Sequence, residues 1–462
     1  MTDDAFCDLL IIDDIYPSSF SPFRTIEYNH YLSFFNSALL SLEGWNLWIN
    51  NTSFAENKHE QETAVGTDLR IYDFKTQYNI GARLVYITFL GNASRLLPYL
   101  EERKLPFILQ LYPGGGFAVN QEDVDEKLRK VLTSDLCRKV IVTQTVTRNY
   151  ILQDKIGCPE DKIEFIFGGV FNSNVDFQFS RDKKLYKHDK DTIDLCFVAH
   201  KYGDDLVSKG YDYFIELAHK LAPRIENLRF HVVGGYEPSD IDVSALGNRI
   251  TFYGSQPNGF FADFYPRMDA IVSVNRPFVL APGAFDGFPT GACLEAGFRG
   301  VANLINDPLA LNSAFVDGQD ILILDDDIEK DVEKIIPLLM DPARLAELGQ
   351  ATCEKFKQVM DVDRQLWQRT RLIAAEISRL ESLVITRTIP SASIEKDAEI
   401  NNLTAEINRI ACIAHNHEET IRAMETQLLS RKFILKILAR RTLGHRLYSA
   451  VRHCVFWLRA RK

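Results

Sequence analysis

Residues 193–198 read IDLCFV, an apolar run of strand length that stands before a polar loop and the helical segment 211–221. Such runs recur along the chain and alternate with amphipathic segments of helix length. Continuous Val, Ile and Leu runs of this length predict parallel strands that are buried on both faces of a sheet. We expect strands at residues 8–12, 45–49, 69–72, 84–88, 107–111, 139–143, 162–167, 193–198, 229–233, 249–253, 270–274, 301–305 and 321–324.

This alternation predicts an α/β protein with two successive doubly wound, Rossmann-like units that face each other across a cleft. The stretch 172–191 is rich in charge, lacks apolar periodicity and is interpreted as the linker between the units. The expected domains are therefore residues 1–175 and 192–358. Closing helices are expected at 359–385, followed by a break near Pro390.

A helical extension is expected at residues 394–430. Its apolar residues follow the three-four spacing of a heptad seam over about four repeats, which favours a self-associating coiled coil. The alternative is one amphipathic helix packed on the body of the protein.

Residues 431–462 differ in charge from the rest of the chain. They carry ten Lys or Arg and no Asp or Glu; with −10 overall and +10 here, residues 1–430 carry −20. Basic residues on one helix face with Phe and Trp on the other suit an anionic membrane surface. The alternative is docking of this basic segment on the acidic body.

Composition excludes several classes of protein. The net charge of −10 argues against bulk nucleic-acid binding, which needs a basic footprint. Eight scattered cysteines form neither a zinc spacing nor a disulfide framework. The N-terminal residues lack the positive charge of a signal peptide, and no apolar run reaches membrane-spanning length. We therefore expect a cytoplasmic protein, peripheral at the inner face of the cell membrane through its basic tail.

Candidate functional residues follow the predicted strands of the second unit. His200 and Lys201 leave the strand 193–198, and Lys209 precedes the next helix, so these basic groups are placed to face a diphosphate. Gly234 follows the strand 229–233 and permits close approach of a ligand to the backbone.

The stretch 286–296 reads DGFPTGACLEA and is the strongest candidate for an anion pocket. Its first part is a turn that exposes backbone N–H groups, and a helix is expected to open at Thr290 or Gly291. A helix start with small residues suits phosphate, and Glu295 on that helix can accept hydrogen bonds from a ribose diol. By contrast, Asp325-Asp326-Asp327 is interpreted as capping a helix and not as a metal site.

Residues 197–372 resemble the donor-binding half of the GT-B retaining glycosyltransferases, the large family-four or group 1 type. The resemblance is carried by Lys209-Gly210, Asp286-Gly287-Phe288 and Leu294-Glu295-Ala296, and by the turn Asp317-Gly318. Asp286 and Glu295 stand nine positions apart, whereas the acidic pair of the family stands eight apart. The first half of the chain resembles the family only loosely.

The resemblance implies roles for these residues in binding a nucleotide-sugar donor. Lys209, with His200 or Lys201, would neutralise the departing diphosphate, so no metal and no other cofactor is expected. Glu295 would hold the ribose hydroxyls. Asp286 would hold hydroxyls of the donor sugar, together with backbone groups of the donor-binding residues Gly287, Phe288, Pro289, Thr290 and Gly291. The anomeric configuration would be retained, with the leaving diphosphate helping to deprotonate the acceptor.

The first unit would then be the acceptor domain. Tyr112, Gly114 and Gly115 stand where the family carries a histidine, in the stretch YPGGGF at 112–117. This stretch lacks a following Gly-Lys-Ser/Thr and is therefore not a P-loop, but its glycines admit close approach of a donor or acceptor. Arg24 lies in the loop after the first predicted strand and is a further candidate for the acceptor site.

The expected function is thus a retaining glycosyltransferase that acts on a glycan or lipid-linked acceptor in bacterial surface polysaccharide synthesis. Two alternatives remain open: a non-catalytic scaffold with this fold, and a sugar-nucleotide epimerase or phosphorylase. The expected partners are a nucleotide sugar, the acceptor, an anionic membrane surface and a second copy of the chain.

Overall fold

The computed structural model describes residues 6–19, 21–42, 53–77 and 79–388. Residues Met1–Val384 belong to one compact unit, which contains two sheets, and Ile385–Lys462 belong to another. The predicted strand at 45–49, the heptad segment 394–430 and the basic tail 431–462 lie outside the described residues.

The first lobe is built on a parallel sheet in the order β3-β2-β1-β4-β5-β6-β7. The prediction of buried parallel strands is confirmed here, because β1, β4, β5 and β6 all have mostly buried residues. The strands are β1 Cys7–Asp13, β2 Ser37–Ser41, β3 Ile71–Asp73, β4 Ala82–Thr88, β5 Phe107–Leu111, β6 Cys137–Val142 and β7 Ile163–Phe165. The helices are α1 Pro22–Phe34, α3 Phe54–Val65, α4 Leu90–Arg103, α5 Glu122–Thr133 and α6 Thr145–Ile151.

Strand β2 was not predicted from the sequence. Its three apolar residues are flanked by Ser37 and Ser41, which shorten the apparent apolar run. Ser37 is nevertheless buried, because its hydroxyl donates a hydrogen bond to the carbonyl oxygen of Tyr31 at the end of α1.

The second lobe is built on a parallel sheet in the order β10-β9-β8-β11-β12-β13. Every strand predicted for this half is present. The strands are β8 Ile193–Val198, β9 Leu228–Val233, β10 Ile250–Phe252, β11 Ala270–Ser273, β12 Ala302–Asn306 and β13 Leu322–Leu324. The helices are α7 Phe179–Asp182, α8 Tyr211–Leu221, α9 Phe260–Phe264, α10 Gly291–Gly297, α11 Ile328–Met340 and α12 Pro342–Val359.

Helix caps in the second lobe follow the sequence. Asp327 caps α11 by accepting a hydrogen bond from the Lys330 N–H, as predicted for the acidic triplet. Its neighbours Asp325 and Asp326 form ion pairs with Lys334 and Arg276. The triplet therefore acts in capping and ion pairing.

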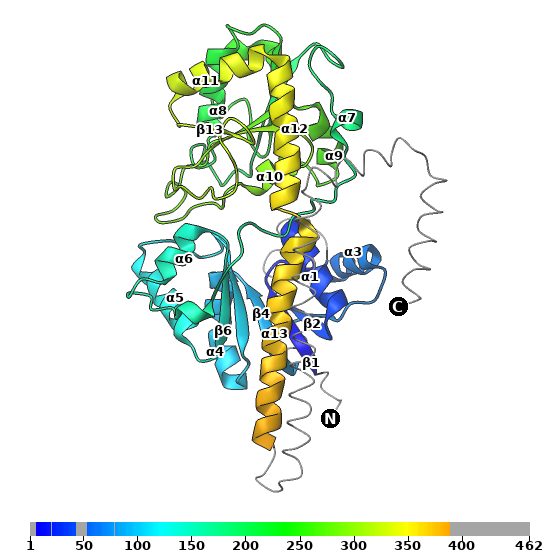
Figure 1. Ribbon diagram of the computed structural model, residues 1–462, viewed down its shortest axis with the longest axis vertical. Coiled ribbons are helices and arrows are strands. Elements are labelled where there is room, and N and C mark those ends of the chain that lie inside the picture. The colour runs from blue at the N-terminus through cyan, green and yellow to red at the C-terminus, as the bar shows by residue number, and fades with distance from the viewer. Residues whose placement is uncertain (1–5, 20, 43–52, 78, 389–462) are drawn as a thin grey trace, which may run out of the picture. The chain divides into compact units, whose positions relative to one another are not determined.

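The long helix α13 Val362–Thr388 returns the chain to the first lobe and lies over one face of the first sheet (Figure 1). Ile373 is fully buried there with Leu9 and Tyr86. In the range 359–385, where closing helices are predicted, one continuous helix covers nearly all residues.

A buried polar network ties α13 to the first sheet. The Arg369 guanidinium, which is fully buried, donates hydrogen bonds to Gln365 at 2.7 Å and Gln110 at 3.2 Å. It also lies 3.6 Å from the carboxylate of Glu27, which accepts a hydrogen bond from Tyr86. Buried charges are tolerated when they are paired and hydrogen-bonded in this way.

None of the described helices combines the length and apolar character that a membrane span needs.

Candidate active site

The candidate site is a cleft between the carboxyl ends of the strands in the two sheets, the usual position for ligands of doubly wound sheets. Its main cavity has a volume of about 320 Å³. On the first-lobe side it is lined by residues that follow β5 and β6, including Tyr112 and Gln144. On the second-lobe side it is lined by residues that follow β8 and β11, including His200 and Asp286.

Lys209 and Asp286 meet at this cavity, although they stand 77 positions apart. The Lys209 Nζ atom lies 2.5 Å from Oδ2 of Asp286, and the side chains retain 15% and 38% exposure. The backbone geometry explains why Lys209 is followed by a glycine, Gly210. This glycine has a φ of +75°, and a Cβ atom there would lie 2.2 Å from the Val274 carbonyl oxygen. Glycine thus lets the start of α8 approach the end of β11 and places Lys209 at the cleft.

His200 and Lys201, the two candidates for a second cation, are placed differently. The His200 ring lines the main cavity, and its pKa is lowered by partial burial and by the charge of Lys209. The Lys201 ammonium is instead bound to Asp240 at 2.7 Å. Gly234 packs against backbone, since a Cβ atom there would lie 2.0 Å from the Ala199 carbonyl oxygen. Of these three described residues, His200 alone borders the main cavity.

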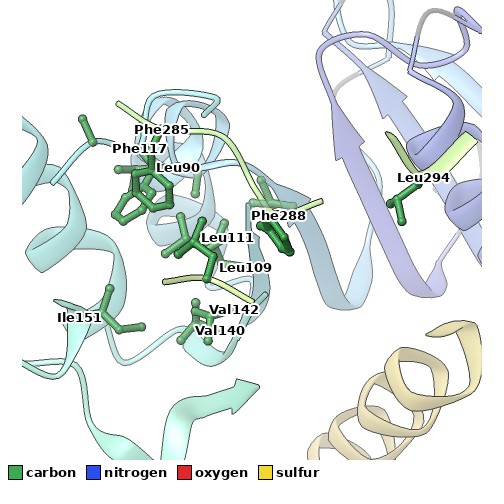
Figure 2. Close-up of a cluster of buried hydrophobic side chains, with 14 of the residues drawn as sticks. Leu90, Leu109, Leu111, Phe117, Val140, Val142, Ile151, Phe285, Phe288 and Leu294 are labelled. Atoms are coloured by element: carbon green, nitrogen blue, oxygen red, sulfur yellow. The ribbon is translucent and has the colours of Figure 1, made fainter. Parts of the chain in front are cut away.

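The segment 276–290, which we call the donor loop, carries Asp286 and is anchored in the first lobe. The Val119 N–H donates a hydrogen bond of 2.9 Å to the Gly283 carbonyl oxygen. Figure 2 shows Phe285 beside Phe117 of the first lobe, and their ring centroids lie 5.8 Å apart. Phe288 is buried in the same cluster as Leu111. Two aromatic anchors therefore hold Asp286 from either side.

Gly287, Phe288, Pro289 and Thr290 line the main cavity and also a second chamber of about 270 Å³. Lys209 and Asp286 border both volumes, so they stand at the junction. Helix α10 begins at Gly291, as predicted, and the Thr290 side chain makes no capping hydrogen bond.

Glu295 lies in an adjoining groove of about 420 Å³ that shares Gly291 with the main cavity. Its carboxylate makes no hydrogen bond within the described residues. Burial raises its pKa, and the charge of Arg299 opposes this rise. Glu295 is therefore separated from Lys209 and Asp286, although one helix start connects the two volumes.

The acceptor-side candidates take three different positions. The guanidinium of Arg24 is bound to Asp13 at 2.8 Å and Asp14 at 2.7 Å, so its charge is already compensated. The Tyr112 ring lines the main cavity, whereas Gly114 and Gly115 border the second chamber. A Cβ atom at Gly115 would overlap the Phe89 ring, which explains the need for glycine at that position.

Sequence reasoning missed Gln144, which is 3% exposed and lines the main cavity. A polar residue directly after the predicted strand at 139–143 was the available signal. It also missed Arg276, which borders the second chamber and pairs with Asp212 and Asp326. In the described part of the chain, no group of three or more His, Cys, Asp or Glu side chains is arranged to hold a metal ion.

No protein-family model matches the sequence, and no curated protein matches it. Solved structures do match the fold. HepE from Anabaena, solved in complex with UDP-glucose, aligns with a TM-score of 0.59 and 11% identity over 80% of this chain and 100% of its own. A glycosyltransferase from Rickettsia africae aligns at 0.58 and 13%, over 81% of this chain and 99% of its own.

A sucrose-phosphate synthase from Thermosynechococcus elongatus aligns at 0.57 and 15%, over 80% of this chain and 99% of its own. These neighbours are GT-B enzymes. At such low identity the likeness concerns the fold alone. The chain has the two-domain α/β fold of the GT-B glycosyltransferases.

Proposed function

We propose that this protein is a retaining glycosyltransferase that moves a sugar from a nucleotide sugar to a glycan or lipid-linked acceptor. The observation that carries the proposal is the Lys209–Asp286 pair at the junction of two chambers, where the carboxyl edges of both sheets meet. The structural neighbour HepE, which was solved with UDP-glucose and with UDP and glucose, supports a nucleotide sugar as the donor.

The proposed reaction breaks the bond between the anomeric carbon and the diphosphate oxygen. The acceptor hydroxyl oxygen bonds to the same carbon, and its proton passes to the leaving diphosphate. Negative charge develops on the diphosphate, so a fixed cation in a partly desolvated cleft lowers the barrier. Lys209 supplies this cation, His200 lies beside it on the same wall, and Asp286 fixes the ammonium and faces donor-sugar hydroxyls.

Glu295 is proposed to bind the ribose of the donor. Its carboxylate borders a groove that adjoins the main cavity and makes no hydrogen bond among the described residues, so it can accept hydrogen bonds from a diol. Burial disfavours the charged form of Glu295 and raises its pKa, and hydrogen bonds donated by ribose hydroxyls would stabilise that charged form.

The setting of the reaction extends this proposal. A role in bacterial surface polysaccharide synthesis would suit a lipid-linked acceptor, with residues 431–462 holding the enzyme at an anionic membrane and residues 394–430 pairing two copies. No metal is assigned a role, because Lys209 and its neighbours are proposed to carry the charge stabilisation.

The test compares Lys209→Met with the wild-type protein and with Lys220→Met. The control removes the partly exposed Lys220 of α8, which pairs with Glu329 of α11. Thermal shift and titration calorimetry with UDP-, GDP- and ADP-sugars measure binding, and release of the nucleoside diphosphate measures turnover. We expect Lys209→Met to lower donor affinity roughly 10- to 100-fold, because a charge-assisted hydrogen bond is lost.

Equal donor affinity in Lys209→Met and Lys220→Met would contradict the role of Lys209. A wild-type protein that neither binds nor consumes any sugar nucleotide would favour the scaffold alternative. Conversion of a sugar nucleotide into its epimer without an acceptor would favour an epimerase.

A further inference from the structure

The first-lobe wall of the main cavity carries no charged residue among those that the structure describes. It is built around four aromatic rings, Phe23, Phe89, Tyr112 and Phe171, which we call the aromatic wall. Phe23 contacts both Tyr112 and Phe171, with ring centroids 5.2 Å and 5.9 Å apart. Phe89 contacts Tyr112 at 6.0 Å. The rings therefore form a continuous apolar surface on one side of the cleft.

The charges of the cleft, Lys209 and Asp286, stand on the opposite wall beside the His200 ring. The guanidinium of Arg24 lies 4.6 Å from the centre of the Phe89 ring and borders the adjoining groove, which Phe23, Phe89 and Phe171 also line. Its charge is compensated by Asp13 and Asp14. A ligand against the aromatic wall therefore meets no uncompensated cation there.

Gln144 and Thr143 are polar residues on this wall, and the Tyr112 hydroxyl is a buried polar group within it. Gln144 is 3% exposed, and its side-chain carbonyl oxygen is buried without a hydrogen-bond partner. A Cβ atom at Gly287 would lie 3.3 Å from the Gln144 Nε2 atom, so the amide stands beside the backbone of the donor loop. Leaving a buried polar atom unpaired costs free energy, so such atoms usually have a partner. A ligand hydroxyl in the cavity would provide that partner.

We propose that the aromatic wall and Gln144 bind the acceptor as an uncharged sugar ring. The C–H face of the ring packs on Phe171 and Phe23, and one hydroxyl hydrogen-bonds to the Gln144 amide. A phosphorylated or carboxylated acceptor group would lose its hydration against this wall without gaining a cation, which is unfavourable. This inference rests on the proposed function and adds to it the chemical class of the acceptor group.

The test measures transfer to neutral p-nitrophenyl pyranosides and to the matching uronides and 6-phosphates. Gln144→Leu keeps a similar side-chain size but removes the hydrogen bond, and Phe171→Leu removes a ring. We expect each variant to raise KM for the neutral acceptor about 10-fold, the effect of losing one such contact. KM for the donor and the affinity for free nucleoside diphosphate should change less than KM for the acceptor, and retained binding of nucleoside diphosphate shows that the variants are folded.

Gln350→Leu is the matched control, since Gln350 is exposed on α12 and its side-chain amide donates a hydrogen bond to Glu354 of the same helix. It should leave both KM values unchanged. Two outcomes would overturn this inference alone. In the first, the wild-type protein transfers sugar and Gln144→Leu has the same KM for the acceptor. In the second, the wild-type protein prefers uronides or phosphates as acceptors. If the wild-type protein transferred sugar to none of the probes and bound no sugar nucleotide, both the proposed function and this inference would be overturned.

Discussion

Lys183 is a lysine buried inside a stretch that the sequence presents as a solvated linker. Its ammonium donates a hydrogen bond to the Met268 carbonyl oxygen, and Asp269 and Lys190 are the nearest charges. Lys190 in turn pairs with Asp194 and Asp269, each at 2.6 Å. The predicted linker is thus fastened to the amino ends of β8 and β11. Burial lowers the pKa of Lys183 to about 8, with Asp269 opposing this shift.

This burial predicts a pH dependence of stability. The folded protein releases the Lys183 proton near pH 8, whereas the unfolded chain keeps it until about pH 10.5. The unfolded state therefore binds more protons in this window, and stability gains with rising pH. Between pH 7 and 11, the free energy of unfolding measured with urea should rise by up to roughly 3 kcal/mol more in the wild-type protein than in Lys183→Met. Parallel pH profiles of the two proteins would contradict the assignment.

At the scale of elements, the donor loop carries the candidate chemistry and depends on its anchor in the first lobe. Gly283 has a φ of +74°, and a Cβ atom there would lie 2.0 Å from the Val119 carbonyl oxygen. The backbone hydrogen bond between Gly283 and Val119 needs this close approach. The position of Asp286, three residues further on, is therefore coupled to the first lobe.

Gly283→Ala should weaken donor binding without touching a residue that lines the cleft. Gly318→Ala is the control, because Gly318 has a φ of +70° and no atom near its missing Cβ. Both variants should lose about 1 kcal/mol of stability from the left-handed conformation. Only Gly283→Ala should lower sugar-nucleotide affinity several-fold in calorimetry, because the loop must shift. Equal affinities would show that the anchor does not position Asp286.

At the scale of the whole molecule, the cleft is made by residues within the first compact unit. The described residues that line its three volumes lie between Ile15 and Leu311. Helix α13 and the Arg369 network return the chain to the first lobe beyond that range.

Deletion of residues 431–462 should separate catalysis from membrane binding. The truncated protein is expected to bind sugar nucleotides with wild-type affinity. It should no longer sediment with vesicles that contain anionic lipid, because ten basic side chains have been removed. Vesicles of neutral lipid provide the control. Unchanged sedimentation with anionic vesicles would refute the membrane role of the tail.

The sequence by itself determined the two sheets. Buried parallel strands need continuous apolar runs, and this requirement is local, so β5 and β8 could be placed with correct bounds. The start of α10 at Gly291 and the cap of α11 at Asp327 are local features as well. Strand β2 was missed because two buried serines conceal it.

Only the tertiary structure decided how the candidate site is assembled. Whether His200 or Lys201 faces the cleft depends on Asp240, which lies 39 positions away and binds Lys201. Gln144 reaches the cavity because the donor loop is anchored opposite it through Phe285 and Gly283. Such choices depend on contacts between segments distant in sequence, and the periodicity of a single segment carries no information about them.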